Sequence, residues 1–375
     1  MKFLKIFIFN LLTIIFLIEA FSFVYFKMGL SISNYRPSYI SNTTDTEAQW
    51  MTEYNPWGAW HKANGRAYKE LRCFGVELIA NSHGARDKER KIESKKSRVV
   101  VLGDSFVEGF GVSAHQRFTN KLEEFTGRPF LNFGASGDFG PLQYSILYQK
   151  LASKFDHSEV LVAILPDNDF TDNDPAHWIK INEAGYQQRY RPYWKQKNSN
   201  MDFSYFYPVK HPEQQITFAD YRKKGGTAGA SLKNRLQRFT WTYGVYRELR
   251  YYTRGSSLTA GTYSGYFDFS QQQLAATLYY LKQIKDNANG KPVSFFTIPR
   301  LSDLIRLQSE KSPLVQKLKE FAAANELSYI DLSESMIANT KKVTELFLPC
   351  DGHWSAFGHS VATEILSSKL FNHKN

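Results

Sequence analysis

Residues 98–105 read Arg-Val-Val-Val-Leu-Gly-Asp-Ser and contain the first strand of the predicted sheet. Four consecutive apolar residues, three of them β-branched, are typical of a strand that is buried on both faces of a parallel sheet. Gly103 lets the backbone turn closely, and Ser105 follows at the turn. A serine there would expose its hydroxyl above the sheet, although Ser and Asp are also preferred as helix N-caps. Both interpretations stay open from this stretch alone.

Four further runs with the same pattern of a buried strand follow along the chain. They are short, apolar and bounded by Gly, Pro, Asp or Asn, and they cover residues 129–133, 160–165, 293–298 and 328–332. Helical patterns alternate with them at residues 116–126, 142–155, 271–288, 313–325 and 356–370. This alternation predicts an α/β protein, a three-layer α/β/α sandwich around a five-stranded, mainly parallel sheet. In such sheets the active site forms beyond the carboxyl ends of the strands.

Residues whose side chains or backbone could take part in catalysis follow the other strands at the same edge of the sheet. Residues 134–138 read Gly-Ala-Ser-Gly-Asp, where a glycine can leave its backbone N–H open to an oxyanion. Asn168 follows the third strand, and its amide is a neutral donor suited to the same task. After the last strand, His353 can act as a general base and Asp351 can orient it. Each block alone has an ordinary structural explanation, but they gain force jointly because each follows a predicted strand at the edge where the active site is expected.

These blocks resemble those of the SGNH (GDSL-type) hydrolase family, over about residues 80–370. The resemblance implies the flavodoxin-like SGNH fold, ester chemistry and no cofactor. The site residues that it implies are the catalytic Ser105, His353 and Asp351 and the oxyanion-hole residues Ser105, Gly137 and Asn168. Gly134 competes with Gly137 for the oxyanion role, and Gly137 is preferred because it stands in Ser-Gly-Asp.

The sequence departs from the family pattern in two places. Pro166-Asp167 stands where Gly-x usually precedes Asn-Asp, which predicts a different local backbone. One residue separates Asp351 from His353, where two are commoner; this spacing is similar to the periplasmic branch that O-acetylates exopolysaccharides.

Residues 81–86, Asn-Ser-His-Gly-Ala-Arg, agree with the family instead, because they resemble the lead-in of some of its branches.

Three functions are compatible with these residues. The first is a serine hydrolase acting on carboxylic esters of a cell-envelope glycan or lipid. The second is an O-acetyltransferase for an extracytoplasmic polysaccharide, which would need a partner protein as acyl donor. The third is a non-catalytic glycan-binding module on the same fold, against which the complete set of site residues argues. The sequence leaves substrate, acyl length and oligomeric state open.

The sequence of the first 26 residues predicts on which side of a membrane the rest of the chain lies. Lys2 and Lys5 precede an apolar run from Ile6 to Phe26, long enough to cross a bilayer as a helix. The lysine bias favours a cytoplasmic N-terminus and an extracytoplasmic catalytic domain, periplasmic or at the cell surface. The alternative is a signal peptide cleaved after Ala20-Phe21-Ser22, but apolar residues continue beyond that site and favour a retained anchor.

Charge and cysteine content restrict the partners. The net charge is +11, but Lys and Arg are scattered, with short clusters only at Lys88–Lys96 and Arg222–Lys224. Anionic lipid or acidic glycan explains this charge more simply than nucleic acid does, and a merely solvated basic surface explains it most simply. The spacing of Asp169, Asp172 and Asp174 does not fit an EF-hand, so no metal is expected. Cys73 and Cys350 permit one disulfide, whose formation stays open.

The predicted domain organisation has three parts. Residues 1–27 form the signal anchor or transmembrane helix, 28–80 the linker and lead-in, and 81–375 the hydrolase domain. An aromatic-rich insertion covers residues 170–266 between the third and fourth strands. Loops of this length are lids or binding segments or carry structure of their own. Its Trp and Tyr side chains suit sugar rings or acyl chains, but core packing is the commoner role of any single one.

Overall fold

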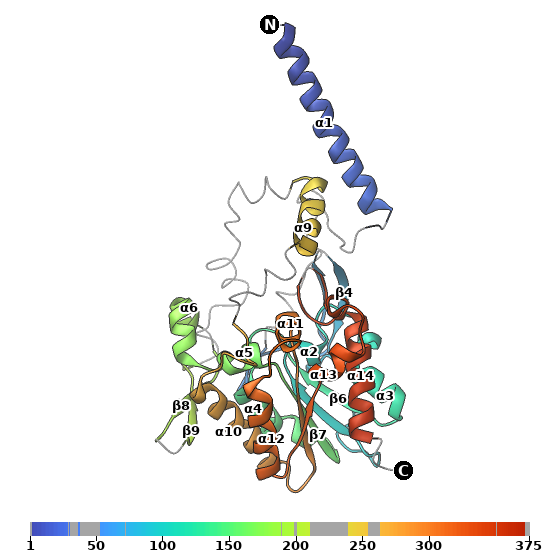
Figure 1. Cartoon of the computed structure of the whole chain (residues 1–375). Coiled ribbons are helices and arrows are strands. Elements are labelled where there is room, and N and C mark those ends of the chain that lie inside the picture. The colour runs from blue at the N-terminus through green and yellow to red at the C-terminus, as the bar shows by residue number, and fades with distance from the viewer. Residues whose placement is uncertain are drawn as a thin grey trace.

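The computed structural model describes residues 2–28, 30, 37, 53–71, 73–188, 190–198, 201–210, 239–253, 263–349 and 351–371. Figure 1 shows a body of sheet and helices from which one long N-terminal helix projects. Cys350 and the Arg222–Lys224 cluster lie outside the described residues, whereas Cys73 is disulfide-bonded.

The central sheet has five parallel strands: β5 (Val99–Gly103), β6 (Phe130–Gly134), β7 (Glu159–Ile164), β10 (Val293–Thr297) and β11 (Ser328–Asp331). Their order across the sheet is β11-β10-β7-β5-β6. Numbered along the chain, this is the 2-1-3-4-5 order of flavodoxin-like folds, in which the strand order reverses between the first and third strands while every strand stays parallel. The predicted α/β class and five-stranded parallel sheet are confirmed.

Helices cover both faces of this sheet, because successive side chains of each strand point to opposite faces. On one face, Val100 and Leu102 share a core with α4 (Pro141–Lys150), α10 (Gln271–Asn287) and α12 (Pro313–Ala324). On the other face, Val99 and Val101 share a core with α3 (Phe118–Thr126), α13 (Ser333–Ala338) and α14 (Ala356–Phe371). The three predicted layers are therefore present.

Short helices that the sequence analysis did not predict follow the strands directly. They are α2 (Ser105–Glu108) after β5, α5 (Pro166–Asp172) after β7 and α11 (Leu301–Leu307) after β10. Single 3-10 turns occur at Ala114–Gln116, Ala152–Lys154 and Val343–Leu346. Pro166 occupies the first turn of α5, where its missing N–H costs nothing, and this explains the departure from Gly-x at that position.

Residues 53–79, predicted as part of a linker and lead-in, form two antiparallel hairpins. The first pairs β1 (Glu53–Asn55) with β2 (Gly58–Trp60), and the second pairs β3 (Arg66–Leu71) with β4 (Phe74–Ile79). Strand β4 alternates buried and exposed residues along its whole length. Its buried side packs with Leu348, which lies just ahead of the Asp-x-His block. The second hairpin thus packs against the segment that leads into that block.

The described part of the insertion also has regular structure. It contains α6 (Pro175–Gln188), the hairpin of β8 (Tyr193–Gln196) and β9 (Phe203–Phe206), and α9 (Trp241–Thr253). Trp178, Tyr193, Trp194 and Trp241 are buried, as expected for core packing. Tyr205 and Tyr246 are exposed.

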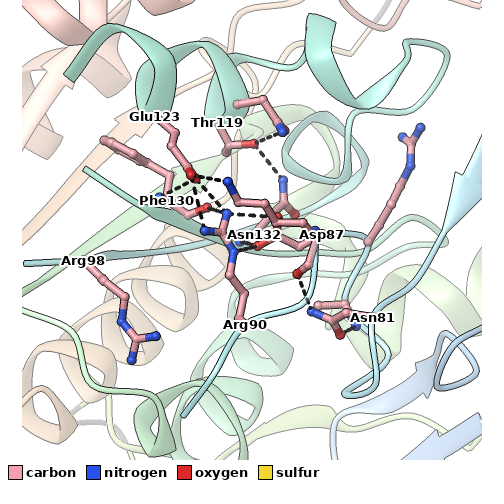
Figure 2. Close-up of polar contacts among 12 residues, drawn as sticks. Asn81, Asp87, Arg90, Arg98, Thr119, Glu123, Phe130 and Asn132 are labelled. Atoms are coloured by element: carbon pink, nitrogen blue, oxygen red, sulfur yellow. Dashed lines mark hydrogen bonds and ion pairs between the residues drawn. The ribbon is translucent and has the colours of Figure 1, made fainter. Parts of the chain in front are cut away.

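A buried polar network ties residues 81–98 to the sheet (Figure 2). Arg90 donates to Asp87 at 2.8 Å, to Glu123 on α3 at 2.7 Å and to the carbonyl of Phe130 on β6 at 2.9 Å. Asp87 in turn accepts from the backbone N–H of Asn132 at 3.1 Å. The pKa of Arg90 is raised because these carboxylates outweigh its burial. Part of the Lys88–Lys96 cluster is therefore structural.

Candidate active site

Three side chains form a hydrogen-bonded line at the carboxyl edge of the sheet. The Nε2 atom of His353 lies 2.7 Å from the hydroxyl oxygen of Ser105. Its Nδ1 atom is hydrogen-bonded to Oδ1 of Asp351, which also accepts from the backbone N–H of His353 at 3.4 Å. The sequence predicts these three residues as one unit, and the fold brings Ser105 and His353 together across 248 positions of the chain.

Ser105 is the first residue of α2, directly after β5. Asp104 is the N-cap of this short helix, because its side chain accepts from the N–H of Phe106 at 2.9 Å. Both interpretations of Gly-Asp-Ser therefore hold, with the aspartate as the cap and the serine in the cavity. Complete burial raises the pKa of Asp104 to about 6, against the opposing hydrogen bond from Phe106 and the nearby His353.

The loop that carries His353 is fixed by its neighbours in the chain. Trp354 is fully buried and packs edge-on against Phe106 at 5.2 Å. The carbonyl of His353 accepts from the N–H of Leu348 at 2.7 Å. The imidazole lies between the rings of Phe106 and Phe110, with centroids at 4.8 and 4.6 Å. These contacts restrict the imidazole without using either of its nitrogens.

Asp351 is held in its ionised form. Burial alone would raise its pKa, but the hydrogen bond and charge of His353 outweigh burial and lower the pKa below its usual value. The charge of Lys69 acts in the same direction. A carboxylate at this position can fix the tautomer of the imidazole and stabilise its protonated form.

The two glycines of the second block have different environments. A Cβ on Gly134 would lie 2.2 Å from the backbone nitrogen of Glu108, so this glycine lets β6 approach α2. Its N–H donates to the side chain of Asn132 at 3.0 Å. Gly137 instead has a φ of 95° and lines the same cavity as Ser105. The geometry favours Gly137 over Gly134 as a donor to an oxyanion.

Glu108, at the end of α2, positions the loop that carries Gly137. Its carboxylate accepts from both the backbone N–H and the hydroxyl of Ser136. Burial opposes this charge, but His61, Arg86 and Ser136 lower the pKa of Glu108 to about 2. Arg86, from the predicted lead-in, also donates to the carbonyl of Glu108 at 3.0 Å. Arg86 therefore helps to fix the C-terminal end of α2 through this hydrogen bond.

Asn168 lies in the first turn of α5 and lines the cavity together with Ser105 and Gly137. Its Oδ1 atom is buried, and within the described part of the chain it has no hydrogen-bond partner. The nearby Asn168 amide lowers the pKa of the Asp104 carboxyl, against the larger effect of burial. The amide therefore lies at the cavity and close to the buried aspartate.

Ser105, Gly137, Asn168, Asp351 and His353 all line one open cavity of about 360 Å³. Two cationic residues that the sequence analysis missed, Lys69 and Arg300, line it as well. Arg300 follows β10, so the rule of strand ends could have indicated it. It is held by Asp167 and by the carbonyl of Tyr263 at 3.1 Å. Lys69 arrives on the β3–β4 hairpin, and its position depends on tertiary packing alone. Among the described residues, no group of three or more His, Cys, Asp or Glu is placed to hold a metal ion.

Comparisons with known proteins return distant likenesses of fold. No family model matches the sequence, and no curated protein matches it. Among solved structures, a lipolytic protein of the G-D-S-L family from Veillonella parvula is 10% identical, with a TM-score of 0.38 over 74% of this chain and 98% of that one. The lipase/acylhydrolase from Enterococcus faecalis is 13% identical, with a TM-score of 0.37 over 74% and 96%. A salicylyl-acyltransferase from a tetracycline biosynthetic pathway is 13% identical, with a TM-score of 0.35 over 76% and 57%. The sheet order and site geometry of this chain do not depend on these likenesses.

Proposed function

We propose that this chain is a membrane-anchored serine hydrolase of the SGNH (GDSL-type) kind that acts on carboxylic esters outside the cytoplasm. The observation that carries the proposal is the hydrogen-bonded line from Ser105 through His353 to Asp351, which opens into a cavity. An ester on a cell-envelope glycan or lipid is the substrate class that suits this placement. The chemistry needs no cofactor.

The proposed reaction has two steps. His353 Nε2 takes the proton of the Ser105 hydroxyl while its oxygen attacks the ester carbonyl, and Asp351 stabilises the imidazolium. The resulting oxyanion accepts hydrogen bonds from the N–H groups of Ser105 and Gly137 and from the amide of Asn168. Collapse expels the alcohol, which takes the proton from His353, and leaves an acyl group on Ser105. Water then attacks this acyl-enzyme with His353 again as base, releasing the acid.

Hydrolysis of a short p-nitrophenyl ester tests this proposal. We expect the wild-type protein to release p-nitrophenol and Ser105→Ala to lose turnover almost completely, because no other nucleophile in the line can replace the hydroxyl. Ser153→Ala, which changes an exposed serine away from the site, serves as the matched control. Equal turnover by Ser105→Ala and wild type would overturn the proposal.

Acetyl transfer to a polysaccharide is the second candidate, and the single residue between Asp351 and His353 favours it. The first step is unchanged, but a sugar hydroxyl replaces water as acceptor, and a partner protein has to deliver the acyl donor. Comparing acetate released into water with acetyl groups gained by a polysaccharide distinguishes the two. A non-catalytic glycan-binding module would give neither, and the hydrogen-bonded line argues against it.

A further inference from the structure

The N-terminal helix α1 (Lys2–Lys27) makes specific contacts with the insertion. It is long and apolar enough to cross a membrane, and only 6% of its apolar stretch is buried. The contacts begin at Glu19, the single acidic residue of the helix. Figure 1 shows α9 beside the end of α1 that joins the body.

Glu19 caps the N-terminus of α9. Its Oε1 accepts from the N–H of Trp241 at 2.6 Å, and its Oε2 accepts from the N–H and hydroxyl of Thr242 at 3.0 and 2.7 Å. One carboxylate thus satisfies two backbone donors that the first turn of a helix leaves unpaired. The charge of Glu19, which is costly in a membrane helix, is compensated by α9.

Further contacts continue along both helices. The hydroxyl of Tyr25 donates to Glu248 at 2.9 Å, and Trp241 packs edge-on against Phe23 at 5.4 Å. Because Glu19 meets Trp241 and Tyr25 meets Glu248, the two helices run in the same direction. The N-terminus of α9 therefore points toward the apolar part of α1.

The length of a bilayer places this contact. Its hydrocarbon core of ~30 Å takes about 20 residues at 1.5 Å per residue. A span of that length that starts at Ile6, just after Lys5, ends near Tyr25. Glu19 then lies about six residues inside the outer boundary, and the first two turns of α9 lie beside it at the same depth.

The outward side of α9 has the side chains that such a position requires. Phe239, just ahead of the helix, is 53% exposed, and Tyr246 and Leu249 are 49% and 57% exposed. Tyr246 and Leu249 are three positions apart and share one face of the helix. Exposed aromatic and aliphatic side chains are expensive in water but are typical of the interface between membrane and water.

We propose that α9 is a second membrane-contacting helix whose N-terminal half enters the outer leaflet beside α1. Glu19 pins it there, and Phe239, Tyr246 and Leu249 contact lipid. This holds the catalytic body directly at the bilayer surface instead of on a flexible tether. The proposal rests on α1 spanning the membrane but not on the chemistry of Ser105.

Photolabelling of the full-length protein tests it. The protein is reconstituted into phosphatidylcholine vesicles that contain a phosphatidylcholine with a diazirine on its acyl chain, irradiated, and mapped by mass spectrometry. We expect lipid adducts on α1 and on residues 239–249, and none at Phe125, a 68% exposed residue of α3. Adducts confined to α1, or equal labelling at Phe125, would overturn the proposal.

A pair of variants tests the role of Glu19. Glu19→Ala should lose the adducts on residues 239–249 and keep those on α1. Thr13→Ala is the matched control, because the Thr13 hydroxyl bonds only to Phe9 of its own helix among the described residues. Unchanged α9 labelling in Glu19→Ala would overturn the pinning role. A thermal unfolding midpoint close to that of the wild type confirms that both variants keep a folded body.

Discussion

Ser105 and His353 come from opposite ends of the folded body's sequence, and their contact depends on how each is held. The serine is fixed by a strand end and a short helix, and the imidazole by Phe106, Phe110 and the buried Trp354. Asp351 completes the line through a hydrogen bond to Nδ1. Each member therefore has a defined orientation before any substrate binds, which is what general base catalysis needs.

Replacing Asp351 by Asn tests the orienting role at the residue scale. The amide keeps the size of the side chain but removes the charge that stabilises the imidazolium and favours the wrong tautomer. We expect kcat for a p-nitrophenyl ester to fall by roughly 10²- to 10⁴-fold with little change in KM. Asp286→Asn, which alters an exposed pair with Lys282, should behave as wild type. A kcat within about twofold of wild type would contradict this role.

Replacing Asp104 by Asn tests the buried carboxyl. Asn keeps the N-cap acceptor, and the pKa of Asp104 is raised from 3.8 to about 6. Between these values the folded protein binds the proton more tightly than the unfolded chain, so the wild type loses stability as pH rises from about 4 to 6, and the loss stays constant above. We expect the free energy of unfolding of Asp104→Asn to match wild type near pH 3 to 4 and to exceed it by up to ~3 kcal/mol above about pH 6.

Chemical denaturation across that pH range measures this difference. The N-cap hydrogen bond to Phe106 is common to both proteins, so it cancels. A difference between variant and wild type that does not change with pH would show that the carboxyl does not titrate where its burial places it.

At the element scale, the close approach of β6 to α2 determines where Ser105 lies. Gly134 makes this approach possible, and Glu108 then connects α2 to the loop of Ser136 and Gly137. Ser105 and the loop of Gly137 are thereby placed by one strand-helix contact. The strand order reverses between β5 and β7, so the site lies where flavodoxin-like folds bind their ligands.

Gly134→Ala should displace α2, because the new Cβ would lie 2.2 Å from the backbone nitrogen of Glu108. We expect a loss of unfolding free energy of about 1 to 3 kcal/mol and a larger proportional loss of kcat, measured by denaturation and ester turnover. Gly127→Ala is the control for a strained glycine in open space, since it has a φ of 67° and no atom within 4 Å. A cost no greater than that of Gly127→Ala would contradict the contact.

The sequence predicts the strands of the central sheet well, but it predicts the short helices and hairpins between them poorly. All five strands are confirmed to within one residue at each end, because their apolar runs are bounded by strong turn residues. The helices α2, α5 and α11 were missed, since four to seven residues give no helical period. The hairpin β3–β4 lies in a segment predicted as linker and lead-in. The alternation of buried and exposed residues along Phe74–Ile79 could have indicated a strand there. Lys69 in the cavity had no local signal at all.

On the scale of the whole molecule, the N-terminal helix and the insertion pack against each other. Their contacts join residues 222 and 223 positions apart, from Glu19 to Trp241 and from Tyr25 to Glu248. Removal of the segment by a signal peptidase would leave the cap of α9 without its carboxylate. If α9 is held by Glu19 as proposed, the anchor is retained and not cleaved.

Mass spectrometry of the protein purified from a membrane fraction tests this expectation. We expect peptides that contain residues 1–27 and a mass without N-terminal trimming, because α9 needs Glu19. Extraction should require detergent, as for other spanning helices. A mature N-terminus just after Ala20 or Ser22 would contradict the retained anchor and, with it, the pairing of α1 with α9.

Covalent labelling with a fluorophosphonate tests whether Ser105 is the nucleophile. Such a probe reacts with a serine that an adjacent base activates. We predict one adduct on the peptide that contains Ser105, its loss in Ser105→Ala and its persistence in Ser153→Ala. Labelling that survives Ser105→Ala, or its absence from folded wild-type protein, would contradict the assignment.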